Sequence, residues 1–130
     1  MANSGKNIQN SRILVTGGMG FVGSAIAARL LREGAGEVRL FDQKRELPNL
    51  LEDLPDKNRL RVIAGDIRNA SEVEEAVKGC DYVFHQAALR VTQCAKEPRL
   101  AHEVMVDGTF NVAPASAQYG IKKLIHASSA

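Results

Sequence analysis

A glycine-rich segment near the N-terminus, residues 16–23, constrains the fold of this chain more than any other feature. It reads Thr-Gly-Gly-Met-Gly-Phe-Val-Gly, which contains a G-x-G-x-x-G pattern from Gly18 and an overlapping G-x-x-G-x-x-G pattern from Gly17. An apolar run at residues 12–16 predicts a buried strand before it, and an alanine- and leucine-rich stretch at residues 20–33 predicts a helix after it. A strand, a glycine turn and a helix in this order are typical of the first unit of a dinucleotide-binding βαβ fold.

The glycines of this segment have separate physical uses. The first permits a turn with positive φ, which a Cβ atom would penalise. Gly20 lets a pyrophosphate approach the backbone, and Gly23 lets the helix pack closely on the strand. A helix N-terminus attracts phosphate because it presents unpaired N–H groups and about half a positive charge. We expect phosphate contacts at Gly17, Gly20, Phe21, Val22 and Gly23; the alternative is a glycine turn that holds no ligand.

Strand and helix patterns alternate along the rest of the chain. Short apolar and β-branched runs predict five strands, at residues 12–16, 38–41, 60–64, 82–85 and 122–126. Helical patterns lie between them, as in βαβ units around a parallel sheet. We therefore expect the α/β fold class, a Rossmann-type doubly wound parallel sheet of about five strands in the order 3-2-1-4-5. No strand pattern follows the fifth, so we expect an incomplete domain, truncated after strand five.

Four helical stretches are expected, at residues 20–33, 47–54, 70–78 and 97–119. Pro48 and Pro55 keep the second one short. Asn69 is a candidate N-cap for the third, with Glu72 three residues later completing a pattern like a capping box. Pro114 lies inside the fourth helix and should kink it, because proline removes a backbone donor and clashes with the preceding turn.

An acidic residue follows the second predicted strand. Asp42 lies 19 residues after Gly23, close to the spacing of about 20 at which dinucleotide-binding units carry a carboxylate. Such a carboxylate accepts hydrogen bonds from the adenosine ribose hydroxyls and repels a 2′-phosphate, so we expect NAD rather than NADP. Lys44 and Arg45 follow closely and would soften that repulsion. The alternative is a solvated loop aspartate.

The composition is that of an ordinary globular domain, with 45% hydrophobic and 25% charged residues among 130. We expect a polar tail at residues 1–11 and an NAD-binding Rossmann domain at residues 12–130. A net charge of +2 with scattered signs does not indicate nucleic-acid binding. Cys80, Cys94 and the three histidines have no metal-ligand spacing, so no metal site is expected. No apolar run indicates a secretory signal or a membrane span, and we expect a cytoplasmic protein.

Several motifs, taken together, resemble those of a known family. They are residues 16–23, Asp42, Gly65-Asp66-Ile67-Arg68, His85-Gln86-Ala87-Ala88 and Gly108-Thr109-Phe110-Asn111-Val112. In this order they resemble the extended short-chain dehydrogenases/reductases, most of all the NAD-dependent epimerase/dehydratase group that includes UDP-sugar 4-epimerases. The resemblance extends over residues 12–130.

The resemblance implies roles for further residues. Asp66 resembles the carboxylate that hydrogen-bonds the adenine amino group, with the Ile67 backbone beside the ring; the alternative is a turn former. Ala87 and Ala88 match small residues that let the loop after strand four approach the nicotinamide ribose, and tight packing alone would also explain them. Ser129 aligns with the catalytic serine, which would hydrogen-bond a sugar hydroxyl or ketone during hydride transfer.

The sequence departs from the family in two places. Met105 stands where the family commonly has an asparagine, three residues before the glycine of the Gly-Thr-x-Asn motif. The family's catalytic Tyr-x-x-x-Lys pair lies after the serine, and the residues up to Ala130 do not contain it. Tyr119 and Lys123 match that spacing, but Gly120 would break the helix that must align them, so we interpret the match as coincidence. We therefore expect this chain to be inactive alone.

Two functions are compatible with these observations. The first is the NAD-binding portion of a nucleotide-sugar epimerase, dehydratase or reductase, in which bound NAD oxidises and re-reduces the sugar. The second is a non-catalytic NAD-binding or redox-sensing module, and a Tyr-x-x-x-Lys pair further along the gene would distinguish the two. We also expect a homo-oligomer that buries the helix at residues 97–119, because edge strands and apolar helix faces invite association.

Overall fold

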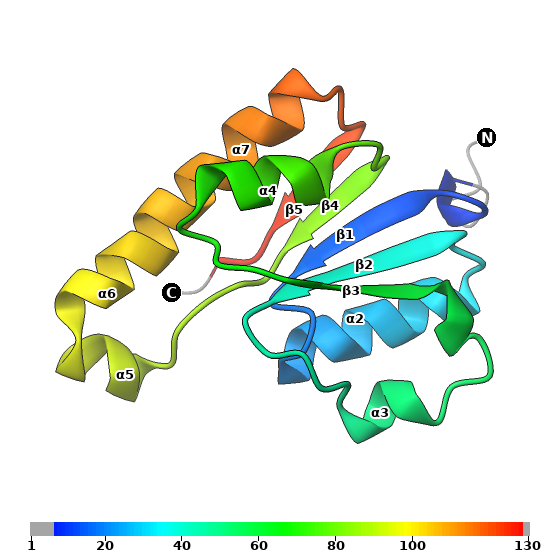
Figure 1. The fold of residues 1–130 in the computed structure, drawn as a ribbon, viewed down its shortest axis with the longest axis horizontal. Coiled ribbons are helices and arrows are strands. Elements are labelled where there is room, and N and C mark those ends of the chain that lie inside the picture. The colour runs from blue at the N-terminus through cyan, green and yellow to red at the C-terminus, as the bar shows by residue number, and fades with distance from the viewer. Residues whose placement is uncertain (1–6, 129–130) are drawn as a thin grey trace.

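The computed structural model describes residues 7–128 and contains one five-stranded sheet in the order β3-β2-β1-β4-β5 (Figure 1). The strands are β1 (Arg12–Thr16), β2 (Glu37–Asp42), β3 (Leu60–Ala64), β4 (Tyr82–His85) and β5 (Lys123–His126). Every neighbouring pair is parallel. The predicted fold class and strand order are confirmed.

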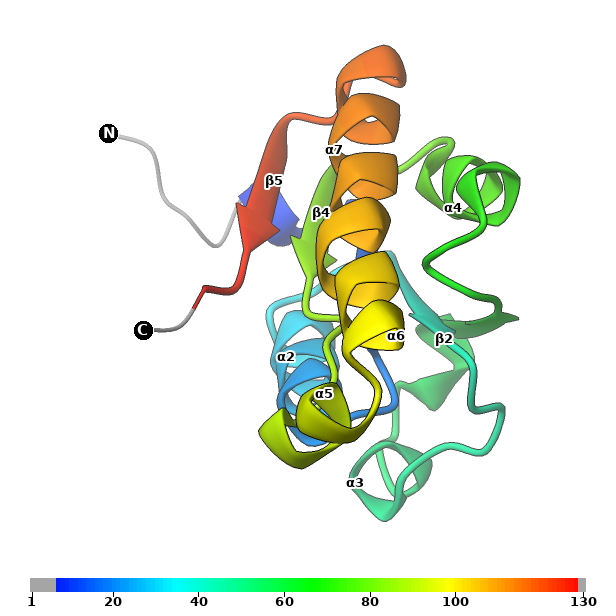
Figure 2. The ribbon, with the colours of Figure 1, turned by 90° about the vertical axis from the view of Figure 1, so that its left-hand side faces the viewer.

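Helices cover both faces of the sheet (Figures 1 and 2). On one face lie α2 (Phe21–Arg32) and the short α3 (Asn49–Glu52), and on the other α4 (Ala70–Val77) packs against α7 (Gly108–Gln118). The remaining elements are the 3₁₀ turn η1 (Lys57–Arg59), α5 (Val91–Lys96), α6 (Pro98–His102) and the π-helical η2 (Glu103–Asp107). Among the described residues, no helix is long and apolar enough to cross a membrane.

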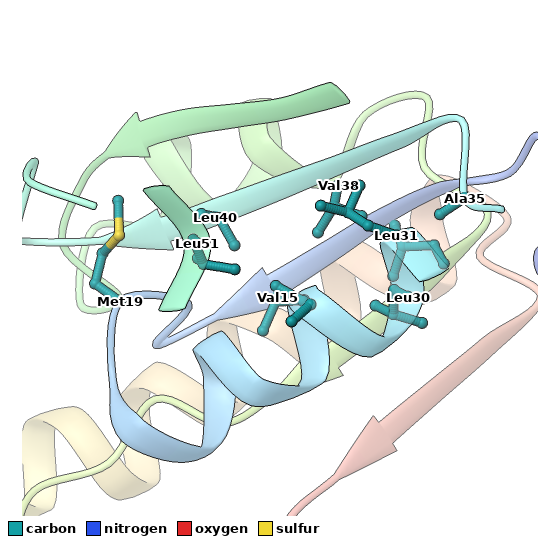
Figure 3. Packing of buried hydrophobic residues seen from close by; sticks show 11 residues of the cluster. Val15, Met19, Leu30, Leu31, Ala35, Val38, Leu40 and Leu51 are labelled. Carbon is teal, nitrogen blue, oxygen red and sulfur yellow. The ribbon is translucent and has the colours of Figure 1, made fainter. Parts of the chain in front are cut away.

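The central strand β1 contributes to two separate cores, because successive residues of a strand point to opposite faces. Ile13 and Val15 pack on the side of α2, whereas Leu14 packs on the side of α4 and α7, and all three are fully buried. Burial on both faces accounts for the continuous apolar run in the sequence. Figure 3 shows the first core, which includes Met19 of the glycine segment, so this core also anchors the loop.

The long predicted helix at residues 97–119 is not one regular α-helix. The structure has α6 over its start and α7 over its end, with the π-helical η2 between them, and Figure 2 shows them following one another along one axis. The sequence analysis also missed α5, just before this region. α7 continues past Pro114 to Gln118, so the proline does not end the helix.

The N-terminus of α4 is capped in a different way from the predicted capping box. The Asn69 side chain accepts a hydrogen bond from the Glu72 backbone N–H, as expected. The Glu72 carboxylate does not return to Asn69; its Oε2 accepts from the backbone N–H of Asp66 at 2.7 Å. Glu72 therefore orders the loop after β3, which holds two of the predicted site residues.

All five strands end at the same edge of the sheet because they are parallel. The glycine segment follows β1, Asp42 ends β2, and the loops at residues 65–68 and 86–89 follow β3 and β4. In doubly wound sheets, ligands bind at this edge, where the strand order reverses. The fold thus gathers residues that are far apart in the sequence.

Candidate functional site

The glycine segment turns sharply at Gly17, which has a φ of +66°. The positive φ therefore belongs to the first glycine of the G-x-x-G-x-x-G pattern and not to Gly18. A Cβ atom on Gly17 would lie 3.0 Å from the Ala87 backbone, and one on Gly18 would lie 2.8 Å from a methyl group of Leu40. The first two glycines let the loop fit between β2 and the loop after β4.

The other two glycines of the segment lie in different surroundings. A Cβ atom on Gly23 would lie 2.1 Å from the Gly17 carbonyl oxygen, so α2 packs on the loop at a distance that only glycine allows. A Cβ atom on Gly20 would meet only that same oxygen, at 3.2 Å. Phe21 and Val22, at the start of α2, are 93% and 56% exposed. The N–H groups in the first turn of α2 lack intrahelical partners, and the side chains of this turn extend into solvent at Phe21 and Val22.

Asp42 connects the end of β2 to the glycine segment. Its Oδ2 accepts a hydrogen bond from the Met19 backbone N–H at 3.1 Å, and its Oδ1 accepts from the Lys44 backbone N–H at 3.2 Å. A carboxylate has about four acceptor positions, so two remain for ligand hydroxyls. The carboxylate is therefore held beside the glycine segment with acceptor positions left for a ligand.

Helix α7 contacts the loop after β3 and fixes its position. Asn111 donates a side-chain hydrogen bond to the Ile67 carbonyl oxygen at 3.0 Å. A Cβ atom on Gly108 would lie 2.9 Å from the Ile67 side chain, so glycine at this position lets the helix cover it. Two members of the Gly-Thr-x-Asn motif thereby fix the loop that also carries Asp66.

One hollow at the carboxyl edge of the sheet joins most of the predicted site residues. It is lined by Gly17, Phe41, Asp42, Gln43, Gly65, Asp66, Ile67, Ala87, Ala88, Leu89 and Val104. Four predicted phosphate contacts are not among these lining residues: Gly20 is the N-cap of α2, and Phe21, Val22 and Gly23 form its first turn. Ser129 lies outside the described residues. Five lining residues were not predicted as site residues. Four of them are next to predicted ones in the sequence, namely Phe41, Gln43, Gly65 and Leu89, whereas no pattern marks Val104.

Tyr119 and Lys123 are not arranged as a catalytic pair. α7 ends at Gln118, Gly120 has a φ of +66°, and Lys123 begins β5 at the opposite edge of the sheet from the site. The two residues therefore share no helix, and the interpretation of their spacing as coincidence is confirmed.

His85, the last residue of β4, is buried and hydrogen-bonded through both ring nitrogens. Nδ1 lies 2.7 Å from Thr16 Oγ1, and Nε2 lies 3.0 Å from Thr109 Oγ1. The ring centroid also lies 5.1 Å from that of His126, with the planes tilted by 32°. These contacts join the ends of β1, β4 and β5 to α7.

The hydrogen bonds of Thr16 define which nitrogen of His85 carries the proton. Thr16 Oγ1 accepts from the backbone N–H groups of Gln86 and Ala87, at 3.0 and 3.1 Å. Its own proton must therefore be donated to His85 Nδ1, because a hydroxyl has one proton and two acceptor positions. The neutral ring consequently carries its proton on Nε2.

The Nε2 proton of His85 is donated to Thr109 Oγ1, whose own proton is donated to the Met105 carbonyl oxygen at 2.8 Å. Every donor in this chain thus has an acceptor when the ring is neutral. Burial lowers the pKa of His85 to about 4, and the neighbouring His126 contributes in the same direction. Met105, which departs from the family pattern, takes part through its backbone.

A parallel sheet in this order, with a glycine loop after its first strand and a carboxylate at the end of its second, defines a Rossmann-type domain. The chain belongs to the 3-beta hydroxysteroid dehydrogenase/isomerase family, whose sequence model matches residues 14–130.

Curated relatives come from two groups of enzymes. The chain is 37% identical to a 3-beta-hydroxysteroid dehydrogenase of Mycolicibacterium neoaurum and 41% identical to human 3 beta-hydroxysteroid dehydrogenase type 7, with 91% and 89% of the chain covered. It is also 33% identical to the UDP-glucose 4-epimerase of Rickettsia rickettsii over 87% of the chain. The chain spans only 32–35% of the length of these relatives.

Solved structures show the same likeness. Pen from Bacillus thuringiensis is 32% identical, with a TM-score of 0.83 over 92% of this chain and 37% of that protein. The Bordetella bronchiseptica enzyme WbmF, solved in complex with NAD+, is 25% identical, with a TM-score of 0.80 over 94% of this chain and 37% of that protein. The predicted resemblance to the epimerase group is confirmed, and the hydroxysteroid dehydrogenases are a second group that the sequence analysis did not name.

Acidification is expected to destabilise the fold through His85. The pKa of about 4 in the folded state lies below the ordinary value of 6.5, so the unfolded state binds more protons between these pH values. The contribution of His85 to the free energy of unfolding should be complete above pH 6.5 and should fall by up to about 3 kcal/mol as the pH drops to 4. Urea denaturation across this range measures it.

His85→Asn is the matched variant, because its side-chain oxygen can accept from Thr16 while the titrating ring is removed. Its free energy of unfolding should depend less steeply on pH than that of the wild type. Equal slopes in the two proteins between pH 4 and 6.5 would contradict the assignment of a buried, neutral histidine.

Proposed function

We propose that residues 12–130 form the NAD-binding portion of an oxidoreductase of the epimerase/dehydratase type. The observation that carries this proposal is the hollow shared by Gly17, Asp42 and Asp66, which come from three separate strand ends. A phosphate loop, a ribose acceptor and a base acceptor along one edge match the successive parts of an adenine dinucleotide. That relatives such as WbmF were solved with NAD+ supports the same cofactor.

In this proposal each part of the site contacts one part of NAD. The first turn of α2, which begins directly after Gly20, binds the pyrophosphate through backbone N–H groups. Asp42 accepts from the ribose hydroxyls, and its negative charge disfavours the 2′-phosphate of NADP. Asp66 accepts from the adenine amino group, while Ala87 and Ala88 allow the cofactor to approach the loop after β4.

The proposed reaction is hydride transfer from an alcohol carbon of the substrate to NAD, with Ser129 hydrogen-bonding the reacting oxygen. The hydroxyl proton would pass to the tyrosine of a Tyr-x-x-x-Lys pair in the whole protein. For the whole protein we propose a nucleotide sugar as substrate, with NAD acting as a transient oxidant. A hydroxysteroid is the second candidate, favoured by the family match and by the identities of 37% and 41%. Both substrates offer a secondary alcohol that can give a hydride to NAD; a hydroxysteroid would leave NAD reduced, whereas the nucleotide sugar takes the hydride back. A non-catalytic NAD-binding module is the alternative of a different class.

Asp42→Ala is expected to weaken NAD binding by about tenfold, because the ribose hydroxyls lose a charged acceptor. NADP binding should change much less, since the repulsion of its 2′-phosphate disappears along with the acceptor. Calorimetry with both cofactors measures the ratio, and Asp53→Ala, which removes an exposed carboxylate after α3, is the control. A ratio of NAD to NADP affinity equal to that of the wild type would argue against the ribose assignment.

Two alanine substitutions in the glycine segment should affect different properties, NAD binding in one and stability in the other. Gly20→Ala meets little protein and should keep the free energy of unfolding within about 1 kcal/mol of the wild type, while its methyl group blocks the approach of phosphate and weakens NAD binding. Gly23→Ala places its Cβ atom against the Gly17 carbonyl oxygen and should destabilise the fold by about 3 kcal/mol. Thermal unfolding and calorimetry separate the two effects. Undiminished NAD binding by Gly20→Ala would contradict the proposed phosphate position.

We also propose that the chain forms a homo-oligomer through η2 and α7. Met105, Val106 and Phe110 are 42%, 52% and 73% exposed there, and apolar side chains on one helix surface favour a self-complementary contact. Light scattering at micromolar concentration should give the mass of an oligomer, and Phe110→Lys should lower it to that of a monomer. Leu50→Lys on α3 is the control for an exposed apolar residue elsewhere. A monomeric wild type would refute this interface.

A further inference from the structure

Arg68 donates hydrogen bonds to the carboxylate of Asp66 from three different N–H groups. Its backbone N–H donates to Oδ1 at 2.9 Å, its Nε donates to Oδ1 at 3.0 Å, and its terminal nitrogen donates to Oδ2 at 2.6 Å. Nε also lies 3.1 Å from Oδ2. A planar guanidinium bound to both oxygens fixes the rotation of the carboxylate as well as its charge.

Arg68 is itself held from the opposite side of the loop. Its other terminal nitrogen donates to Oε2 of Glu103 at 2.9 Å. Glu103 begins the π-helical η2, so the guanidinium spans from the loop after β3 to the helix that covers it. The three side chains remain 28–38% exposed, which leaves the carboxylate accessible to a ligand.

The charges around Asp66 are otherwise negative. Glu72 on α4 and Glu103 and Asp107 on η2 line the outer side of the loop, and Asp42 lies across the hollow. Among the described residues that line these two surfaces, Arg68 is the one cation. Hydrogen bonds from Arg68 lower the pKa of Asp66 below its ordinary value. Without the guanidinium of Arg68, Asp66 would lose its two-point partner and the largest cause of its lowered pKa, and among the side chains only the smaller contribution of Gln43 would remain.

We propose that Arg68 is a positioning residue for base recognition: it holds Asp66 as an ionised, oriented acceptor that selects a purine with an amino group over one with a carbonyl oxygen. The proposal rests on the proposed function, in which Asp66 faces the adenine ring. Adenine presents a donor where hypoxanthine presents an acceptor, and a fixed carboxylate repels the latter. Arg68 binds no part of the nucleotide itself; it acts through Asp66.

The test compares the binding of AMP and IMP, which differ at this position of the base. The wild type should bind AMP about tenfold more tightly than IMP, as expected for a hydrogen bond to a charged acceptor. Arg68→Met should reduce the preference to about twofold or less. Its preference should also weaken as the pH falls from 8 to 5, whereas that of the wild type should stay constant, because Arg68 keeps Asp66 ionised throughout this range.

Three further variants make each outcome decisive. Arg68→Lys keeps the positive charge but cannot bind both carboxylate oxygens through a planar group, so its preference for AMP over IMP should lie between those of the wild type and Arg68→Met. It replaces Arg68→Met if that variant does not fold. Arg61→Met removes an exposed arginine on β3 and should behave as the wild type. Asp66→Asn should shift the preference toward IMP, because its amide can donate to the carbonyl oxygen.

The results separate the two proposals. An unchanged preference in Asp66→Asn would refute the position of Asp66 in the proposed function. A shifted preference in Asp66→Asn together with wild-type preference and pH dependence in the Arg68 variants would refute only the role of Arg68.

Discussion

The hydroxyl group of Thr16 holds the centre of the site together. It is buried at the end of β1, accepts from two backbone N–H groups of the loop after β4, and donates to His85. A buried hydroxyl with all three positions satisfied fixes the loops around it, because each lost bond would leave a polar group without a partner. The glycine segment starts at this residue, so both oxygens of Thr16 hold it against the loop at residues 86–88: the hydroxyl as described, and the carbonyl oxygen by accepting from the Gln86 backbone N–H at 3.2 Å.

The fold was predictable because its signals are local. A strand that is buried on both faces has a continuous run of apolar residues in the sequence. The turn that follows β1 needs a positive φ, which favours glycine whatever lies around it. Parallel strands joined by helices then leave few topologies to choose from. The positions of Asp42 and of the loop after β3 follow from that topology alone, since parallel strands end at one edge.

The parts that could not be predicted depend on contacts between distant residues. His85 donates to Thr109, and Arg68 donates to Glu103, yet no spacing in the sequence marks these pairs or the π-helical turn that lies beside them. In the same way, Glu72 fits the pattern of a capping box, but the Asp66 backbone competes for its carboxylate. A local pattern names the candidate donor or acceptor, and tertiary structure selects its partner.

Helix α7 contacts both the loop after β3 and the end of β4. Gly108 and Asn111 lie three residues apart and therefore on one face of α7, where both contact Ile67. Thr109 lies about 100° around the same helix, from the geometry of 3.6 residues per turn, and there it contacts His85. The same helix thus contacts Ile67 in the loop at residues 65–68 and His85 at the end of β4. The loop after β3 and the end of β4 are therefore joined through one helix, although 18 residues separate Ile67 from His85 in the sequence.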